Sequence, residues 1–125
     1  MLDLGDIGAP RSRWIPLSGA LHGVEVEVRY VGPRDQEKFR QQMVRDGILK
    51  IKEGTHVINN GRDGDFFKSF AKMYVTGWRG DIKPEDAPYN ADTMGTVLGA
   101  YNVAFSQVSE AVGEETDFFP VNGNG

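Results

Sequence analysis

Two histidines and two closely spaced aspartates are the side chains of this sequence that could support metal-dependent chemistry. His22 and His56 are its only histidines, and neither has a second histidine at helical spacing, as a zinc-binding pair on a helix would require. Asp63 and Asp65 flank Gly64 as acids do at the start of a calcium loop, but the glutamate that closes such a loop does not follow. The favoured interpretation is that the histidines are surface residues and that the aspartates belong to a turn.

Other catalytic arrangements are missing from the sequence. The chain has no cysteine, which excludes a disulfide framework, a thiolate zinc site and a catalytic thiol. Its 16 glycines form no phosphate-binding loop, nucleophile elbow or dinucleotide fingerprint. We therefore expect a protein that is not an enzyme, with no catalytic residue, cofactor or metal site. A small metal-dependent hydrolase that uses His56 with Asp63 or Asp65 is kept as an alternative.

The distribution of charge restricts the class of partner. The chain has 14 basic and 18 acidic side chains, and residues 63–125 hold only four of the basic ones against ten of the acidic ones. Nucleic-acid binding needs a basic face, so we expect no nucleic-acid partner. The first ten residues carry two acids and no base, unlike a signal peptide, and no apolar run is long enough to cross a membrane. We expect a cytoplasmic protein without a membrane partner.

The elements that would position any site begin with GVEVEVRYV at residues 23–31. Valines alternate there with charged side chains, which is the period of a half-buried strand with Val26 and Val28 in the core. The upstream RWIPLSG reads as a short extended segment, and GALHG would connect the two as a loose hairpin.

Helical patterns dominate the rest of the chain. The first predicted helix follows Gly32-Pro33 and ends at Gly47. Residues 48–64 predict an irregular segment or a second short strand, because they contain turn dipeptides. The second predicted helix begins near Asp63 or Asp65, and its aromatic residues recur at spacings of three and four as far as Trp78.

The last predicted helix begins at Asn90, whose side chain can accept hydrogen bonds from the first free amides of a helix. An apolar stripe with a period of 3.6 then continues for about five turns, to Val112.

Together these patterns predict an α+β fold that is mainly helical, with an N-terminal β-hairpin or short sheet followed by three helices. Residues 1–112 would form one domain with a flexible segment at 1–11, and residues 113–125 would form a flexible C-terminal tail. The predicted core and structural residues are Val26, Val28, Phe39, Phe66, Phe70, Tyr74, Trp78, Leu98, Tyr101 and Phe105.

The last predicted helix also predicts a binding surface, because no charged side chain occurs from Thr93 to Ser109. A glycine inside a helix costs about 1 kcal/mol relative to alanine, so its two internal glycines indicate close approach by another backbone. That backbone belongs either to the domain's own hairpin or first helix, or to another protein. The paired phenylalanines of the tail either fold back onto the core or bind a partner. The candidate partner-binding residues are Gly95, Gly99, Asn102, Ser106, Phe118 and Phe119.

The order of several short segments resembles a known family. GVEVEVRYVGPRDQEKFR is followed by VTGWRGDI, by a turn leading to PYNADT, and by an uncharged helix. This order is similar to the small tail assembly chaperones of long-tailed, siphovirus-type bacteriophages, over about residues 23 to 112. The residues at the family's motif positions are Val75, Trp78, Gly80, Ile82, Pro88, Tyr89 and Asn90.

The resemblance implies a non-enzymatic phage protein made in the host cell cytoplasm. Such a protein binds the tape measure protein and helps the tail tube protein to polymerise around it; a homo-oligomer is also compatible with the resemblance. The main alternative is a structural tail or connector component that is retained in the virion.

Overall fold

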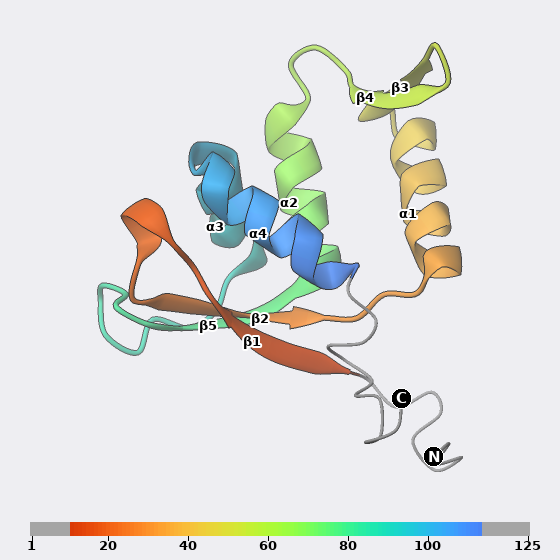
Figure 1. The fold of residues 1–125 in the computed structure, drawn as a ribbon. Helices are drawn as coiled ribbons and strands as arrows, with labels where there is room; N and C mark the ends of the chain where they lie inside the picture. The colour runs from red at the N-terminus through yellow and green to blue at the C-terminus, as the bar shows by residue number, and fades with distance from the viewer. Residues whose placement is uncertain (1–10, 114–125) are drawn as a thin grey trace, which may run out of the picture.

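The computed structural model of the chain describes residues 11–113. The predicted flexible ends, residues 1–11 and 113–125, therefore lie outside the described residues except for Arg11 and Gly113. Figure 1 shows the elements in their chain order, which are β1 (Ser12–Pro16), a short 3-10 helix (Gly19–Leu21), β2 (Val24–Arg29), α1 (Pro33–Arg45), β3 (Leu49–Lys52), β4 (Thr55–Ile58), α2 (Asp63–Tyr74), β5 (Val75–Gly80), α3 (Ala91–Ala100) and α4 (Asn102–Val112).

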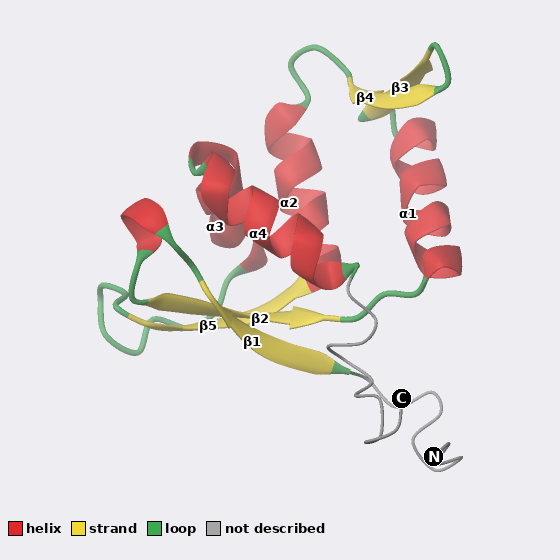
Figure 2. Cartoon of the chain, viewed as in Figure 1, coloured by secondary structure: helices red, strands yellow, loops and turns green. Residues whose placement is uncertain are grey.

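The prediction of one N-terminal hairpin or short sheet followed by three helices is wrong. The described residues form four α-helices and five strands in two sheets, and the strands are interleaved with the helices along the chain (Figure 2). Two segments account for the difference. Residues 49–58 form a β3–β4 hairpin where an irregular segment or one short strand was expected, and residues 75–80 form a strand where a helix was expected.

The three-stranded sheet has the order β1-β2-β5, with both pairings antiparallel. Alternation along β2 points Val26 and Val28 to one face, where both are fully buried under α2, α3 and α4 (Figure 1). The other face is polar. There the guanidinium of Arg79 pairs with Glu25 at 2.9 Å and lies 4.1 Å from the ring centroid of Trp14. The sheet and its helices thus form two layers with the core between them.

The second predicted helix ends four residues early, at Tyr74, and the chain continues as β5. Val75 and Thr76 are β-branched and favour a strand, and β5 completes the open edge of β2. Trp78 lies opposite Val26 in this pairing, on the core side of the sheet. Its position fits helical spacing from Tyr74 equally well, which is why the pattern alone did not separate the two structures.

The last predicted helix is two helices. Tyr101 leaves the helical conformation at φ −122° and ψ 95°, so that α3 ends and α4 begins at this residue. Its amide donates to the Val97 carbonyl, which closes α3, and its carbonyl accepts from the Phe105 amide, which opens α4. The break turns the Tyr101 side chain outward, and its 40% exposure corrects the prediction that Tyr101 is a core residue.

The main core joins the sheet to α2, α3 and α4. Five of the other predicted core residues are buried in it, namely Val26, Val28, Phe70, Tyr74 and Leu98. Four more, Phe39, Phe66, Trp78 and Phe105, are partly buried and pack against it. A second, smaller cluster of Met43, Ile48 and Leu49 lies between α1 and the β3–β4 hairpin, and Phe39 and Phe66 pack against both clusters.

Helices α2 and α3 approach each other closely, and Gly95 makes this possible. A methyl group placed on Gly95 would lie 2.6 Å from the Cα of Lys68 in α2, closer than real side-chain carbons approach a backbone. At the other internal glycine, Gly99, an added methyl group would lie 3.1 Å from the ring of Phe67 in α2. The backbone that Gly95 admits and the ring that Gly99 admits therefore both belong to α2, and not to the hairpin or the first helix.

We predict that Gly95→Ala destabilises the fold although alanine is the better helix former. Insertion of extra carbons into a packed contact costs about 1 to 3 kcal/mol, and the upper part of this range applies here because two of the atoms that the methyl group would strike are backbone atoms. That cost exceeds the propensity gain of about 1 kcal/mol. Urea denaturation should show a lower free energy of unfolding. The matched control is Gly64→Ala in α2, because the new methyl group there would have no atom within 4 Å apart from its chain neighbours and the backbone of its own helix. A Gly95→Ala protein as stable as the Gly64→Ala protein would contradict the close contact.

Candidate protein-binding surface

The segment between β5 and α3 is held by the side chains of Trp78 and Tyr89. The indole Nε1 of Trp78 donates to the Ala87 carbonyl at 2.9 Å, and the Tyr89 hydroxyl donates to the Val75 carbonyl at 3.0 Å. The two rings meet edge to face, with centroids 5.1 Å apart. These contacts fold the loop of residues 81–90 back onto the strand that precedes it.

A glycine and an asparagine set the two ends of this segment. Gly80 ends β5 at φ +102°, and a side chain there would strike the Gly23 carbonyl, which is 2.2 Å from the position of a Cβ. Asn90 precedes α3, and its side-chain oxygen accepts from the Thr93 amide at 3.0 Å, which confirms the predicted helix cap. Five of the seven family-motif residues thus help to position α3. They are Val75, Trp78, Gly80, Tyr89 and Asn90.

A mostly apolar pocket of about 430 Å³ lies beside this segment. It opens between the β1–β2 connection, the loop of residues 81–90 and α3, and its lining includes Leu21, Trp78, Ile82, Pro88 and Val97. Ile82 and Pro88 are the remaining two motif residues. The pocket is large enough to accept an apolar side chain of a partner.

The predicted partner-binding residues separate into a buried and an exposed group. Gly95 is buried against α2, so it is not available to another protein, which corrects its assignment as a binding residue. Gly99, Asn102 and Ser106 are exposed. Phe118 and Phe119 lie outside the described residues.

The exposed group belongs to a larger neutral surface where α3 meets α4, which we name the uncharged corner. Tyr101 is 40% exposed and Val103 is 54% exposed, and they are two of the three large hydrophobic residues that are exposed in the described part of the chain. Exposed apolar side chains without neighbouring charges in the sequence indicate a protein contact. The uncharged corner consists of Thr96, Gly99, Ala100, Tyr101, Asn102, Val103 and Ser106.

Sequence reasoning missed the two most apolar members of this corner. Tyr101 was assigned to the core because it continues the stripe of an unbroken helix, and Val103 lies outside that stripe. The signal that was available is the lack of charge over the whole segment, which does not identify the exposed residues.

The residues considered for metal chemistry are spread over the fold. His22 is exposed in the turn before β2, whereas His56 lies on β4. Asp65 is paired with Arg62 at 2.6 Å. Within residues 11–113 no group of three or more potential metal-binding side chains comes together, and no helix there is both long and apolar enough to cross a membrane.

Comparison with known proteins returned no match. No protein-family model, no curated protein and no solved structure shows significant similarity to this chain. The geometry of the uncharged corner and the resemblance of the motif residues are therefore the grounds on which a function can be proposed.

We predict that Tyr89→Phe lowers the free energy of unfolding by about 1 kcal/mol at neutral pH, because the Val75 carbonyl loses its donor. Burial raises the pKa of the Tyr89 phenol to about 12 from 10.0. The folded state then holds this proton where the unfolded state releases it, so the stabilisation is present below pH 10 and is lost as the pH rises from 10 to 12. Chemical denaturation from pH 10 to 12 should show a smaller decrease in the free energy of unfolding for Tyr89→Phe than for the unmodified chain.

The control is Tyr101→Phe at an exposed tyrosine. Tyr74, whose pKa is also raised by burial, is present in both variants and contributes equally to them. An identical pH dependence in the Tyr89→Phe and Tyr101→Phe proteins would show that the Tyr89 contact has been assigned wrongly.

Proposed function

We propose that this chain is a tail assembly chaperone of a long-tailed bacteriophage. It would act without catalysis in the host cytoplasm, bind the tape measure protein, and assist polymerisation of the tail tube around it. The observation that carries the proposal is the uncharged corner, where Tyr101 and Val103 are exposed on a chain that is otherwise rich in charge.

The uncharged corner suits an apolar partner because little free energy is needed to remove water from it. The resemblance implies a tape measure protein that is long, helical and apolar. When charged side chains are covered by such a surface, they lose hydration that the apolar partner does not replace. The uncharged corner avoids this cost, because its exposed members are apolar, small or neutral polar side chains.

The shape of the corner suits a helix from the partner. Small exposed residues such as Ala100 and Ser106 allow a helix to approach closely, and Tyr101 and Val103 supply anchors beside them. A partner helix would place apolar side chains at spacings of three and four against this surface.

The motif residues give a second line of support. The residues that carry the family resemblance include those that hold the β5–α3 segment and cap α3. A motif with this structural task would be shared by proteins that present the same α3–α4 surface.

We predict that Val103→Lys and Ser106→Lys each weaken binding to the tape measure protein. An ammonium group buried in an apolar contact costs at least about 1.4 kcal/mol, which is a tenfold loss of affinity. Co-purification of the tagged chain with the tape measure protein from cells that make both would measure this loss.

The matched control is Gln41→Lys, which adds the same charge at an exposed position on α1, away from the uncharged corner. Thermal unfolding should be similar in all three variants, since the three positions are exposed. Full binding by both corner variants would contradict the proposed surface.

A further inference from the structure

A second pocket lies between α1 and α2, and we name it the aromatic groove. It has a volume of about 440 Å³ and opens between α1, the β3–β4 hairpin, α2 and the last turns of α4. Aromatic rings form much of its lining, and they belong to Phe39, Phe66, Phe67, Phe70, Tyr74 and Phe105. Arg40 also lines the groove, and its guanidinium is paired with Glu37 at 2.9 Å.

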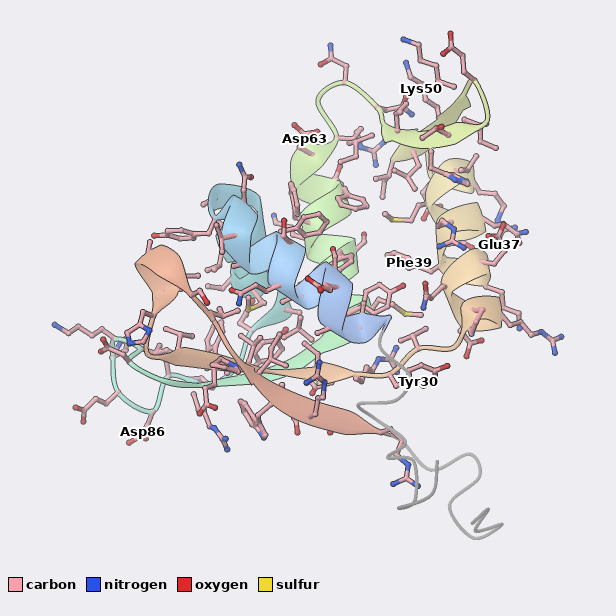
Figure 3. All side chains as sticks on the ribbon, in the orientation of Figure 1. Tyr30, Glu37, Phe39, Lys50, Asp63 and Asp86 are labelled. Atoms are coloured by element: carbon pink, nitrogen blue, oxygen red, sulfur yellow. The ribbon has the colours of Figure 1, made fainter. Side chains whose placement is uncertain are left out.

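The groove exists because α1 packs mainly on β3 and stands apart from α2. Its contacts to the main core include the edge of Phe39, whose ring centroid lies 5.7 Å from that of Tyr74. In Figure 3, Phe39 extends from α1 toward α2, while Glu37 lies on the outer side of the helix. Phe39, Phe66 and Phe105 remain only partly buried, so apolar surface along the groove stays in contact with water.

The last turns of α4 lie at this groove. Ser109 and Val112 line it, and Gly113 comes directly after α4. Phe118 is five residues beyond Gly113, so an extended chain lets it reach up to about 17 Å, which exceeds the roughly 8 to 10 Å between the axes of packed helices.

The charges of the two parts are complementary. Residues 33–62, which form α1 and the β3–β4 hairpin, hold seven basic and four acidic side chains. Residues 114–125 hold three acidic side chains and no basic one. The acids precede the two phenylalanines, so an aromatic pair follows the charges that the basic side chains of α1 and the hairpin would attract.

We propose that residues 114–125 bind in the aromatic groove of their own chain. The rings of Phe118 and Phe119 would contact the aromatic rings of the groove in edge or offset arrangements, and Glu114, Glu115 and Asp117 would lie near the basic side chains of α1 and the hairpin. The groove is thus a binding site for an aromatic and acidic segment, separate from the uncharged corner, and the inference does not depend on the identity of any phage partner.

A spin label on residue 121 tests the proposal directly. The chain has no cysteine, so Val121→Cys supplies a single attachment site in the full-length protein. We expect the label to broaden the NMR signals of Phe66, Phe70 and Phe105, and to leave those of Leu21 and Ile82 in the other pocket sharp. Phe118→Ala/Phe119→Ala in the labelled chain should abolish the broadening of the groove signals.

Two charge reversals on one helix give the matched comparison. Arg40 lines the groove, whereas Arg45 is exposed on α1 and does not. Arg40→Glu should reduce the broadening more than Arg45→Glu, and added salt should reduce it in the unmodified sequence. Equal effects of the two reversals would contradict a specific contact at the groove.

Three further outcomes would overturn the proposal. The first is broadening confined to the residues next to Gly113, and the second is broadening of the uncharged corner in place of the groove. The third comes from a mixture of isotope-labelled chains without a spin label and spin-labelled chains without isotope. If the broadening in that mixture is as strong as in the chain that carries both labels, the segment in the groove comes from a second copy of the chain.

Discussion

The contact between the backbones of α2 and α3 is the constraint on which the rest of the structure depends. Gly95 lies against Lys68 with no room for a side chain, so α3 is held directly on α2. This placement brings the end of α3 over the aromatic side of α2, where Phe105 of α4 packs against Phe70 with ring centroids 5.0 Å apart. Between these two contacts the chain leaves the helical conformation at Tyr101. The corner that results is exposed because both of the helices that form it have already buried their other sides.

The β5–α3 segment delivers α3 to that contact in the correct position. Trp78 and Tyr89 fasten the loop to β5, and Asn90 starts the helix at a defined residue. One helical turn after Asn90, Met94 and Gly95 are buried, with Gly95 against α2. A change in loop length or in the cap would rotate α3 and place a larger side chain where only glycine fits. The motif and the glycine contact are therefore two parts of one packing arrangement, and the uncharged corner depends on both.

The sequence was sufficient where a local pattern and the tertiary structure agree. The alternation of β2, the limits of α1 between Pro33 and Gly47, and the Asn90 cap are all set by neighbouring residues. It was insufficient where one segment fits two patterns, or where the element that packs against it is far away in the sequence. Trp78 fits both helical and strand spacing, and the strand forms because β2 has an open edge. No proline marks the break at Tyr101, and Gly99, two residues before it, still belongs to α3. The break follows from packing α4 on the sheet and α2. The glycines of the last segment indicated a close neighbour, but no local feature identified it as α2. For the binding surface, the uncharged run was visible, whereas the division into a buried Gly95 and an exposed Val103 requires the fold.

The central claim is that the exposed side of the α3–α4 corner is where this chain contacts its partner. A photo-crosslinking amino acid at position 103 of the full-length chain, in cells that also make the tape measure protein, tests it most directly. The account predicts covalent capture of the tape measure protein from position 103, at a helical apolar segment, and no capture from the same group at position 41 on α1. Capture from position 41 but not from position 103 would contradict the account and place the contact elsewhere on the molecule.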